Sequence, residues 1–463
     1  MRQMNKPLES SFRDPNGFIF TQNGVVYRQI NHSYQADYTC LMASGLYAYL
    51  TEKRWLLAHE TVEFDEILLP FSDVSNPVYK TICPEQMSFI SYPSSWSFGM
   101  LKDAALLTLK IQKAALKHGM ILKDASAYNV QFRGSQPVFI DTLSFEKYHE
   151  GMSWAAYGQF CRHFLAPLAL MKYTDISLNS LFITQLDGVS LPLAAKLLPF
   201  KTRLSLNLYL HIHLHANTQI KFQDKKVNTK ASLSLQKLNN LIQSLEDTIK
   251  SLDWKPQNTE WFDYYDKSVS DAYYEHKSAL IDAFLATIKP HTLLDLGAND
   301  GTFSKIAAKY AHEILSFDID PACVELNYQR LKKEKNRQIT PLIVNILNPE
   351  PSIGWNNTER PRLFERTNCD TIMALALIHH LCISNNTPLS KIAEFFSLYC
   401  QNLIIEFVPK SDEKVQILLQ NRPDIFHDYT LEGFKTAFST YFAIQKMIEI
   451  EPTHRVLFLM SKI

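Results

Sequence analysis

The strongest pattern of apolar and polar positions lies in the last two hundred residues. From Lys277 onward, stretches with helical spacing alternate with short apolar runs that end in a polar residue. Helices are expected up to Ile288 and near 302–311, and strands at Thr292–Asp295, Ile314–Asp318, Pro341–Val344, Thr371–Leu375 and Asn402–Glu406. Strands that alternate with helices form parallel sheets. The pattern therefore predicts an α/β fold with a doubly wound sheet.

The first half of the chain has a mixed pattern. Short β-rich pieces such as Gly24–Ile30 are followed by residues 101–118, which place apolar side chains at helical spacing before Gly119. Two strand-like runs, at 129–132 and 137–140, are joined by four turn-forming residues, which predicts a hairpin that leaves Asp141 at a strand end. This half is expected to be an α+β domain.

The length of 463 residues favours two domains, because single cores stop growing near ~250–300 residues. Residues 232–252 have the pattern of an amphipathic helix, and a linker-like Lys255–Thr259 follows. We therefore expect an N-terminal domain at 1–205, a basic and helical connector at 206–258, and the doubly wound domain at 259–463.

The composition is that of a folded protein, and the balanced charges give the chain no overall electrostatic attraction to nucleic acid or membrane. Hydrophobic residues make up 46% of the sequence, and 47 basic residues balance 47 acidic ones. The start has no apolar core of a signal peptide, and no window reaches the ~18 uncharged apolar residues of a membrane span, so a cytoplasmic protein with no membrane partner is expected. The seven cysteines are scattered without a Cys-x-x-Cys pair, which predicts reduced thiols and no metal site.

Candidate ligand residues follow the predicted strands. Ligands bind beyond the carboxyl ends of the strands in a doubly wound sheet. Asp295, Gly297 and Gly301 follow the first strand, where the glycines let the backbone turn sharply and approach a ligand. The helix that begins near Thr302 would present backbone N–H groups to an anion. Asp318 ends the next strand, where an acid can accept both ribose hydroxyls.

The segment Asp295-Leu-Gly-Ala-Asn-Asp-Gly301 resembles the first motif of class I S-adenosylmethionine-dependent methyltransferases, Asp/Glu-x-Gly-x-Gly-x-Gly, with Asn299 in place of the middle glycine. The resemblance implies that S-adenosylmethionine is the cofactor, that Ile319 flanks its adenine and that Asn345 hydrogen-bonds the adenine edge. It also implies a Rossmann-like sheet that ends in an antiparallel hairpin. The strand-like runs at 440–444 and 455–459 fit that hairpin.

A nicotinamide dehydrogenase is the nearest alternative, because Asp318 would suit a ribose there as well. Its fingerprint is Gly-x-Gly-x-x-Gly, whereas the loop here is Gly297-Ala-Asn-Asp-Gly301. Asp318 alone could equally be a solvated turn acid. The ordered set of residues favours the methyltransferase.

The methyl acceptor side has three candidate residues. Transfer to a hydroxyl or ammonium group requires removal of a proton, and His379 or His380, after the fourth strand, could be the general base. The equal alternative is that one histidine packs in the following helix and the other only shapes the pocket. Glu406 ends the fifth strand and is either a pocket residue or an acid paired with a neighbouring base. The Asn/Asp-Pro-Pro-Tyr/Phe signature of many N-methyltransferases is absent.

The first half contains a second constellation. The spacing of Asp124, Asn129 and Asp141 resembles that of the protein-kinase and aminoglycoside-phosphotransferase superfamily, which implies nucleotide phosphates and magnesium around these residues. Leu122-Lys123 and Thr142-Leu143 depart from the motifs of that superfamily, and no glycine-rich phosphate loop is present. We expect a degenerate kinase-like domain that binds a nucleotide or the substrate, with a chance coincidence of three polar residues as the alternative.

In overall organisation the chain resembles bacterial two-domain proteins related to the host-specific nodulation methyltransferases, through Ile378–Leu381 and Ile404–Lys410. The expected function is methylation of a small molecule or glycan-like metabolite at oxygen. One alternative is an RNA methyltransferase that uses the eight basic residues of 196–237, namely Lys196, Lys201, Arg203, Lys221, Lys225, Lys226, Lys230 and Lys237. Another is a binding protein whose kinase-like half senses a nucleotide. The sequence indicates no oligomeric state.

Overall fold

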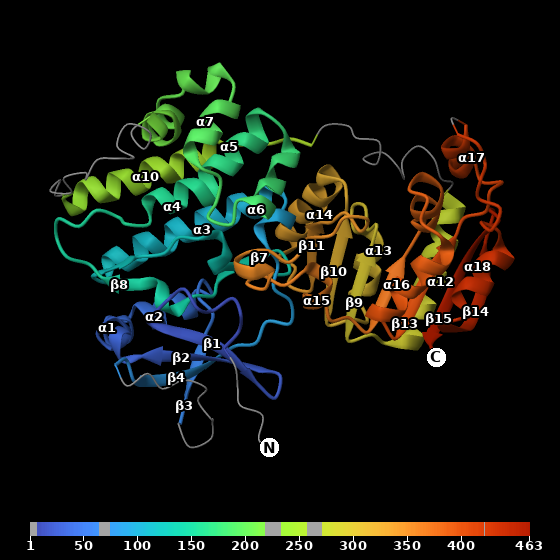
Figure 1. Ribbon diagram of the computed structural model, residues 1–463, viewed down its shortest axis with the longest axis horizontal. Coiled ribbons are helices and arrows are strands. Elements are labelled where there is room, and N and C mark those ends of the chain that lie inside the picture. Colours follow the sequence, from blue (N-terminus) through green and yellow to red (C-terminus); the bar gives the residue numbers. More distant parts are fainter. Residues whose placement is uncertain (1–6, 64–74, 218–232, 257–270, 421) are drawn as a thin grey trace. The chain divides into compact units, whose positions relative to one another are not determined.

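The structure is a computed structural model that describes residues 7–63, 75–217, 233–256, 271–420 and 422–463 (Figure 1). The chain divides into two compact units. The first unit comprises Met1–Phe132, Pro137–Lys255 and Pro351–Arg362, and the second comprises Arg133–Gln136, Pro256–Glu350 and Leu363–Ile463. The segment Pro351–Arg362 therefore belongs to the first unit although its flanks belong to the second.

The first unit begins with an antiparallel sheet in the order β1-β2-β4-β3. Its strands are β1 (Gly17–Gln22), β2 (Val25–Asn31), β3 (His59–Val62) and β4 (Val78–Pro84). Two residues with positive φ, Asn23 and Gly24, connect β1 to β2, as tight hairpins require. Helices α1 (Gln35–Ala43) and α2 (Leu46–Glu52) follow β2.

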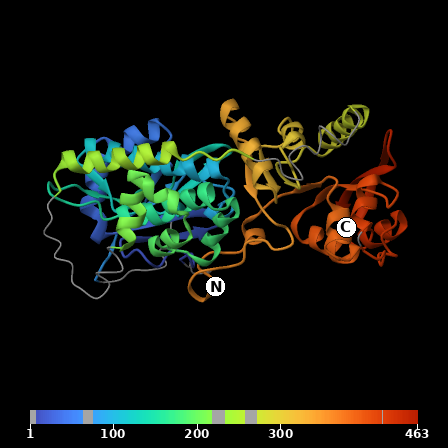
Figure 2. The ribbon, with the colours of Figure 1, turned by 90° about the horizontal axis from the view of Figure 1, so that it is seen from above.

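Helix α3 (Phe98–Lys117) is the long helix of the first unit, and the sequence prediction of it is confirmed. The hydroxyl of Ser97 caps its first turn, and the chain leaves it at Gly119 with φ of +72°. Helix α10 (Leu235–Ser251) lies beside α3 in both ribbon views (Figures 1 and 2). Glu246 of α10 forms an ion pair with Lys113 of α3, and both helices belong to the first unit.

Two small strand pairs follow α3. Strand β5 (Met120–Leu122) pairs with β8 (Phe145–Lys147), and β6 (Val130–Arg133) pairs with β7 (Gln136–Phe139), which confirms the predicted hairpin. The remaining helices of the unit are α4 (Tyr157–Phe160), α5 (Ala166–Tyr173), α6 (Leu181–Thr184), α7 (Leu191–Leu197) and α8 (Leu206–Leu208), with π-helical turns at Cys161–Leu165 and Tyr209–Leu214.

The second unit contains, in the described residues, a seven-stranded sheet in the order β11-β10-β9-β12-β13-β15-β14. Its strands are β9 (Thr292–Leu296), β10 (Glu313–Asp318), β11 (Ile339–Ile343), β12 (Thr371–Ala374), β13 (Asn402–Phe407), β14 (Phe442–Ile450) and β15 (Arg455–Lys462). The first five are parallel, and the β14–β15 hairpin joins β13 in antiparallel register. The predicted doubly wound sheet and its final hairpin are both present.

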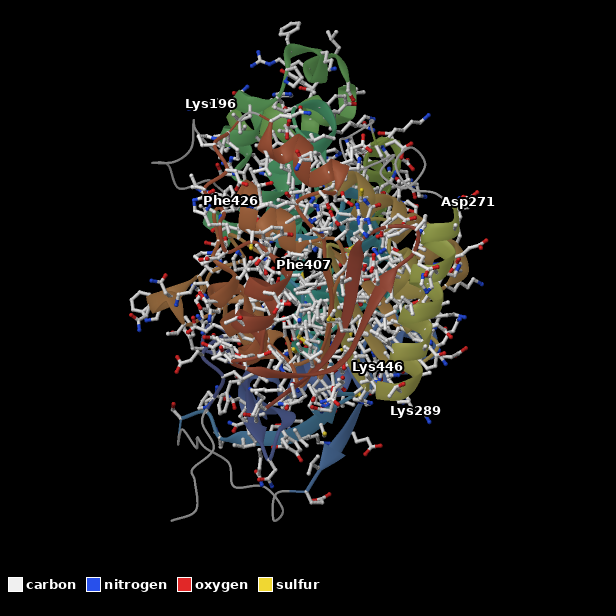
Figure 3. All side chains as sticks on the ribbon, turned by 90° about the vertical axis from the view of Figure 1, so that its right-hand side faces the viewer. Lys196, Asp271, Lys289, Phe407, Phe426 and Lys446 are labelled. Atoms are coloured by element: carbon white, nitrogen blue, oxygen red, sulfur yellow. The ribbon has the colours of Figure 1, made fainter. Side chains whose placement is uncertain are left out.

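Helices cover both faces of this sheet. Helices α12 (Asp271–Ile288) and α13 (Thr302–Ala307) share one apolar core with the sheet, and Figure 3 labels Asp271 and Lys289 at the two ends of α12. On the other face, Phe434 of α18 (Leu431–Phe438) lies 4.8 Å from the ring of Phe458. The other helices are α14 (Pro321–Glu334), α15 (Leu363–Arg366), α16 (Leu389–Tyr399) and α17 (Glu413–Leu419). Within the described ranges, no helix is long and apolar enough to cross a membrane.

Candidate functional site

The second unit holds a cavity of about 390 Å³ where its parallel strands end. The polypeptide reaches it at the carboxyl ends of β9, β10 and β12 and just after β11, as expected for a doubly wound sheet. Much of its wall is apolar and is formed by Leu296, Phe317, Ile319, Val344, Ile346, Leu347, Leu375, Leu377, Leu381 and Leu418. Few polar groups remain to orient a ligand, which is typical of small-molecule sites.

Five of the seven predicted cofactor residues line this cavity: Gly297, Asn299, Asp318, Ile319 and Asn345. They come from three loops that are well separated in sequence. The sheet therefore brings into one cavity residues that were predicted separately, each after a different strand.

Asp318 is the acidic group of the cavity. Its two carboxylate oxygens accept hydrogen bonds from the backbone N–H groups of Asn299 (2.7 Å) and Asp320 (2.8 Å). Burial raises the pKa of Asp318 to about 6, and these N–H bonds oppose the rise. The carboxylate is thus fixed in orientation and still has acceptor capacity toward the cavity.

Asn299 explains the irregularity in the glycine motif. Its φ is +51°, the left-handed conformation that glycine favours and asparagine tolerates better than other residues. Its side-chain oxygen also accepts the N–H of the following Asp300 at 2.7 Å. The loop can therefore keep the turn without the middle glycine.

The other two motif residues lie outside the cavity wall. Asp295 is buried and accepts a 2.6 Å hydrogen bond from the Ser304 hydroxyl, and burial raises its pKa to about 7. Gly301 has φ of +77°, and a Cβ there would meet the Asn327 amide nitrogen at 2.2 Å. Both residues stabilise the conformation of the loop without lining the cavity.

One N–H group at the start of α13 is already used, because Asp300 accepts the N–H (3.1 Å) and the hydroxyl (2.7 Å) of Thr302. Asp300 precedes the N-cap residue Gly301, and its side chain bonds to the backbone two residues on, as aspartates in turns do. The binding of an anion by the other N–H groups of this helix start stays a prediction.

The two candidate histidines occupy different environments. His380 lines the cavity, and burial lowers its pKa to about 4, so the ring is neutral at neutral pH. His379 is fully buried outside the cavity wall, with its ring 4.1 Å from that of His380. Burial holds the pKa of His379 well below its usual value.

Glu406 lies outside the cavity wall, in a buried polar cluster. Its carboxylate accepts a 2.7 Å hydrogen bond from the Tyr273 hydroxyl and lies 2.6 Å from Nζ of Lys277 and 3.4 Å from Nη1 of Arg455. Arg455 in turn binds Asp412 at 2.7 Å. The arrangement matches the alternative in which the strand-end acid is paired with a neighbouring base.

Sequence reasoning expected the end of the fourth strand near the methyl acceptor, through His379 and His380, but gave no role to the two turn residues Ala376 and Leu377. Ala376 and Leu377 line the cavity, and Ala376 has φ of +48°, which is unusual for a residue with a Cβ. Such conformations cluster at ligand sites. No sequence signal marked this turn, because alanine gives no indication of positive φ.

The first unit holds a second cavity, of about 490 Å³, and Asp124, Asn129 and Asp141 all line it. Asp141 forms an ion pair with Arg28 and accepts a hydrogen bond from Ser144. Asp124 accepts the N–H of Ser126 at 2.9 Å. The structure thus brings the three polar residues together, and no group of three or more His, Cys, Asp or Glu within the described chain is arranged to hold a metal ion.

The basic residues considered for RNA binding are only partly described. Lys221, Lys225, Lys226 and Lys230 lie outside the described residues. Lys196, Lys201, Arg203 and Lys237 belong to helical segments of the first unit.

The sheet order, the terminal hairpin and the strand-end cavity place the second unit among the doubly wound α/β ligand-binding folds. Over 444 residues the chain is 32% identical to the nodulation protein NoeA of Rhizobium meliloti (strain 1021), with 93% of this chain and 91% of that protein covered. The chain belongs to the family of this nodulation protein. No family model matches the sequence.

Three solved structures were compared with the chain. The N-methyltransferase NodS of Bradyrhizobium japonicum WM9 has 10% identity and a TM-score of 0.32, with 42% of this chain and 98% of NodS covered. Magnesium protoporphyrin IX methyltransferase of Synechocystis PCC 6803, with bound SAM, has 14% identity and a TM-score of 0.31, with 44% and 93% covered. The bifunctional kinase-methyltransferase WbdD has 14% identity and a TM-score of 0.30, with 46% and 45% covered. Matches at this level assign no function.

Proposed function

We propose that the second unit is an S-adenosylmethionine-dependent methyltransferase that acts on a small molecule or glycan-like metabolite at an oxygen atom. The observation that carries the proposal is the position of Asp318, whose oriented carboxylate meets the loop of Gly297 and Asn299 in one cavity.

The residues present fit this cofactor. The carboxylate of Asp318 at the end of β10 would accept the two ribose hydroxyls, and the neighbouring Ile319 and Val344 would offer apolar surface to an adenine ring. The side-chain amide of Asn345 would hydrogen-bond the polar edge of that ring. The bound cofactor would supply a methyl group on a sulfonium centre.

The chain's own contribution to the reaction is positioning and proton transfer. The apolar walls of the cavity exclude water and hold donor and acceptor in line. His380 is neutral at neutral pH and can accept the proton of an acceptor hydroxyl, whereas His379 and Glu406 lie outside the wall. His380 is therefore the proposed base, with His379 as its packing partner.

Isothermal titration of the full-length chain with S-adenosylmethionine tests the cofactor assignment. Saturable binding to one site is expected, and absence of binding would overturn the proposal. Incubation with tritiated cofactor and either a metabolite extract or tRNA then tests the acceptor class. Label is expected in the small-molecule fraction, and label in tRNA would favour the RNA methyltransferase instead.

A further inference from the structure

The cavity of the first unit is a separate site with its own chemistry. Its wall combines strands β1 and β2, the segment 123–129, Asp141, Gln159 and the inserted segment 351–362. Every one of these elements except β1, which contributes Gly17 and Ile19, presents a charged or amide side chain to it. Such a concentration of polar groups around one cavity calls for a polar ligand.

A divalent cation does not fit this wall. Mg²⁺ requires free carboxylate oxygens, whereas both oxygens of Asp141 are already used. One accepts from the Arg28 guanidinium and from the N–H of Leu143 (3.2 Å), and the other accepts from the Ser144 hydroxyl. The amide nitrogen of Asn129 donates to the same hydroxyl at 3.1 Å, which ties Asn129 and Asp141 to one Ser144 side chain. Arg28 therefore occupies the position of a cation on Asp141.

The charge of the wall disfavours a polyanion. The basic groups that line it are Arg13, Arg28, Lys123 and Arg360, and the acidic groups are Asp14, Asp124, Asp141, Asp187 and Glu359. Four positive charges thus face five negative ones, and two of the positive charges are neutralised by ion pairs, Arg13 with Glu359 at 2.7 Å and Arg28 with Asp141. A nucleoside triphosphate without a metal ion would meet net negative charge, which costs binding energy.

The wall does match a ligand that both donates and accepts hydrogen bonds. Asp124 offers a half-buried carboxylate as an acceptor. Nδ1 of His163 and Nε of Arg28 belong to residues of the wall and have no hydrogen-bond partner in the described part of the chain, but both atoms are almost completely covered by protein. His163 is only 2% exposed, and burial lowers its pKa to about 3, so it is a neutral ring. Hydroxyl groups suit a wall that holds both donors and acceptors, because each hydroxyl is itself both a donor and an acceptor.

An aromatic surface completes the wall. The guanidinium of Arg360 lies 4.5 Å from the centre of the Tyr128 ring, and Tyr128 itself lines the cavity. We propose that the first-unit cavity is a metal-independent binding site for a neutral polyhydroxylated ligand, a saccharide or polyol, in which the Arg28 guanidinium takes the place of a metal ion on Asp141. The proposal does not depend on methyl transfer in the second unit.

Saturation-transfer NMR on the full-length chain tests the ligand class. The probes are maltose, cellobiose, sucrose and myo-inositol, each measured with Mg²⁺ and with EDTA, and ATP measured with Mg²⁺. We expect transfer to at least one of the neutral compounds, unchanged by EDTA, and none to ATP. Transfer to ATP that requires Mg²⁺, or no transfer to any of the four neutral compounds, would overturn the proposal.

Variants locate the site. Asp124→Asn is expected to reduce the transfer at least fivefold, while Glu52→Gln, whose side chain is 76% exposed, leaves it unchanged. Asp318→Ala in the second unit should also leave it unchanged. Loss of transfer in Asp318→Ala but not in Asp124→Asn would place the ligand in the other cavity and contradict the proposal.

Mn²⁺ binding, followed by electron paramagnetic resonance, tests the role of Arg28. The wild-type chain should bind no Mn²⁺ at this cavity, and Arg28→Met should gain a site that Arg28→Met/Asp141→Asn lacks. The double variant removes both members of the ion pair and is the control for folding. Mn²⁺ binding by the wild type that disappears in Asp141→Asn, or no gain in a folded Arg28→Met chain, would show that Arg28 does not occupy a cation position.

Discussion

Nζ of Lys277 lies 2.6 Å from Oε2 of Glu406, and both side chains are buried, 1% and 0% exposed. The pair joins α12 to the end of β13. Removal of one partner from a buried ion pair leaves an uncompensated charge. Lys277→Met is therefore expected to destabilise the second unit by about 3–5 kcal/mol, as measured by denaturant unfolding.

A double-variant cycle and a surface control define the expectation for Lys277. Lys277→Met/Glu406→Gln should recover part of the lost stability, because it removes both charges. Lys309→Met, which breaks the exposed pair with Asp282 of α12, should change stability little. Equal effects of Lys277→Met and Lys309→Met would contradict the structural role of the buried pair.

Asp318 gives a prediction for cofactor affinity. Asp318→Ala removes a charged hydrogen-bond acceptor and should weaken S-adenosylmethionine binding at least tenfold, or about 1.5–3 kcal/mol, in isothermal titration. Since the pKa of Asp318 is raised to about 6, wild-type affinity should also fall as the pH is lowered through 6 and the carboxylate becomes protonated. Asp300→Asn, in the adjacent loop between β9 and α13 but outside the cavity wall, is the matched control. An unchanged affinity in Asp318→Ala would remove the main support for the cofactor assignment.

Asp295 gives a prediction for stability against pH. Burial raises its pKa in the folded chain to about 7, above the ordinary value of 3.8, so the folded state binds the proton more tightly than the unfolded state. This group therefore favours folding below about pH 4 and loses that contribution as the pH rises to 7, by a total of about 2–4 kcal/mol. Asp295→Asn should flatten this part of the stability curve, whereas the exposed Glu432→Gln should not. The prediction would be contradicted if the free energy of unfolding of the wild type rose with pH over this range and Asp295→Asn left that dependence unchanged.

Gly301 gives a prediction for the loop backbone. Gly301→Ala combines a left-handed conformation with a Cβ only 2.2 Å from the Asn327 amide, so a loss of about 2 kcal/mol or more is expected in thermal unfolding. Gly301→Ala/Asn327→Ala should recover the part that is due to the contact. Asn299→Gly is the comparison at a neighbouring positive φ and should be nearly neutral. A stable Gly301→Ala single variant would show that the loop can move without cost.

Much of the second unit could be predicted because its signals are local. Each strand is a short apolar run, and Asp318 and Asn345 stand where the runs end, so their meeting in one cavity follows from parallel topology. The partners of Glu406 could not be predicted, because Lys277 and Arg455 come from distant helices and strands. For the same reason, the spacing of Asp124 and Asp141 gave no indication that Arg28 neutralises the latter.

The two adjacent histidines give the sharpest test of the proposed reaction. His380 lines the cavity, so His380→Ala should lower the rate of methyl transfer about 10²–10⁴-fold while cofactor binding, measured by titration, changes little. His379 is fully buried, so His379→Ala should mainly lower the melting temperature through the cavity that it creates. Because the pKa of His380 is about 4, its base form is complete at neutral pH, and the rate should be flat above pH 6 with respect to this group. A rate loss in His379→Ala that exceeds the loss in His380→Ala, with both proteins folded, would assign the proton transfer to a different group.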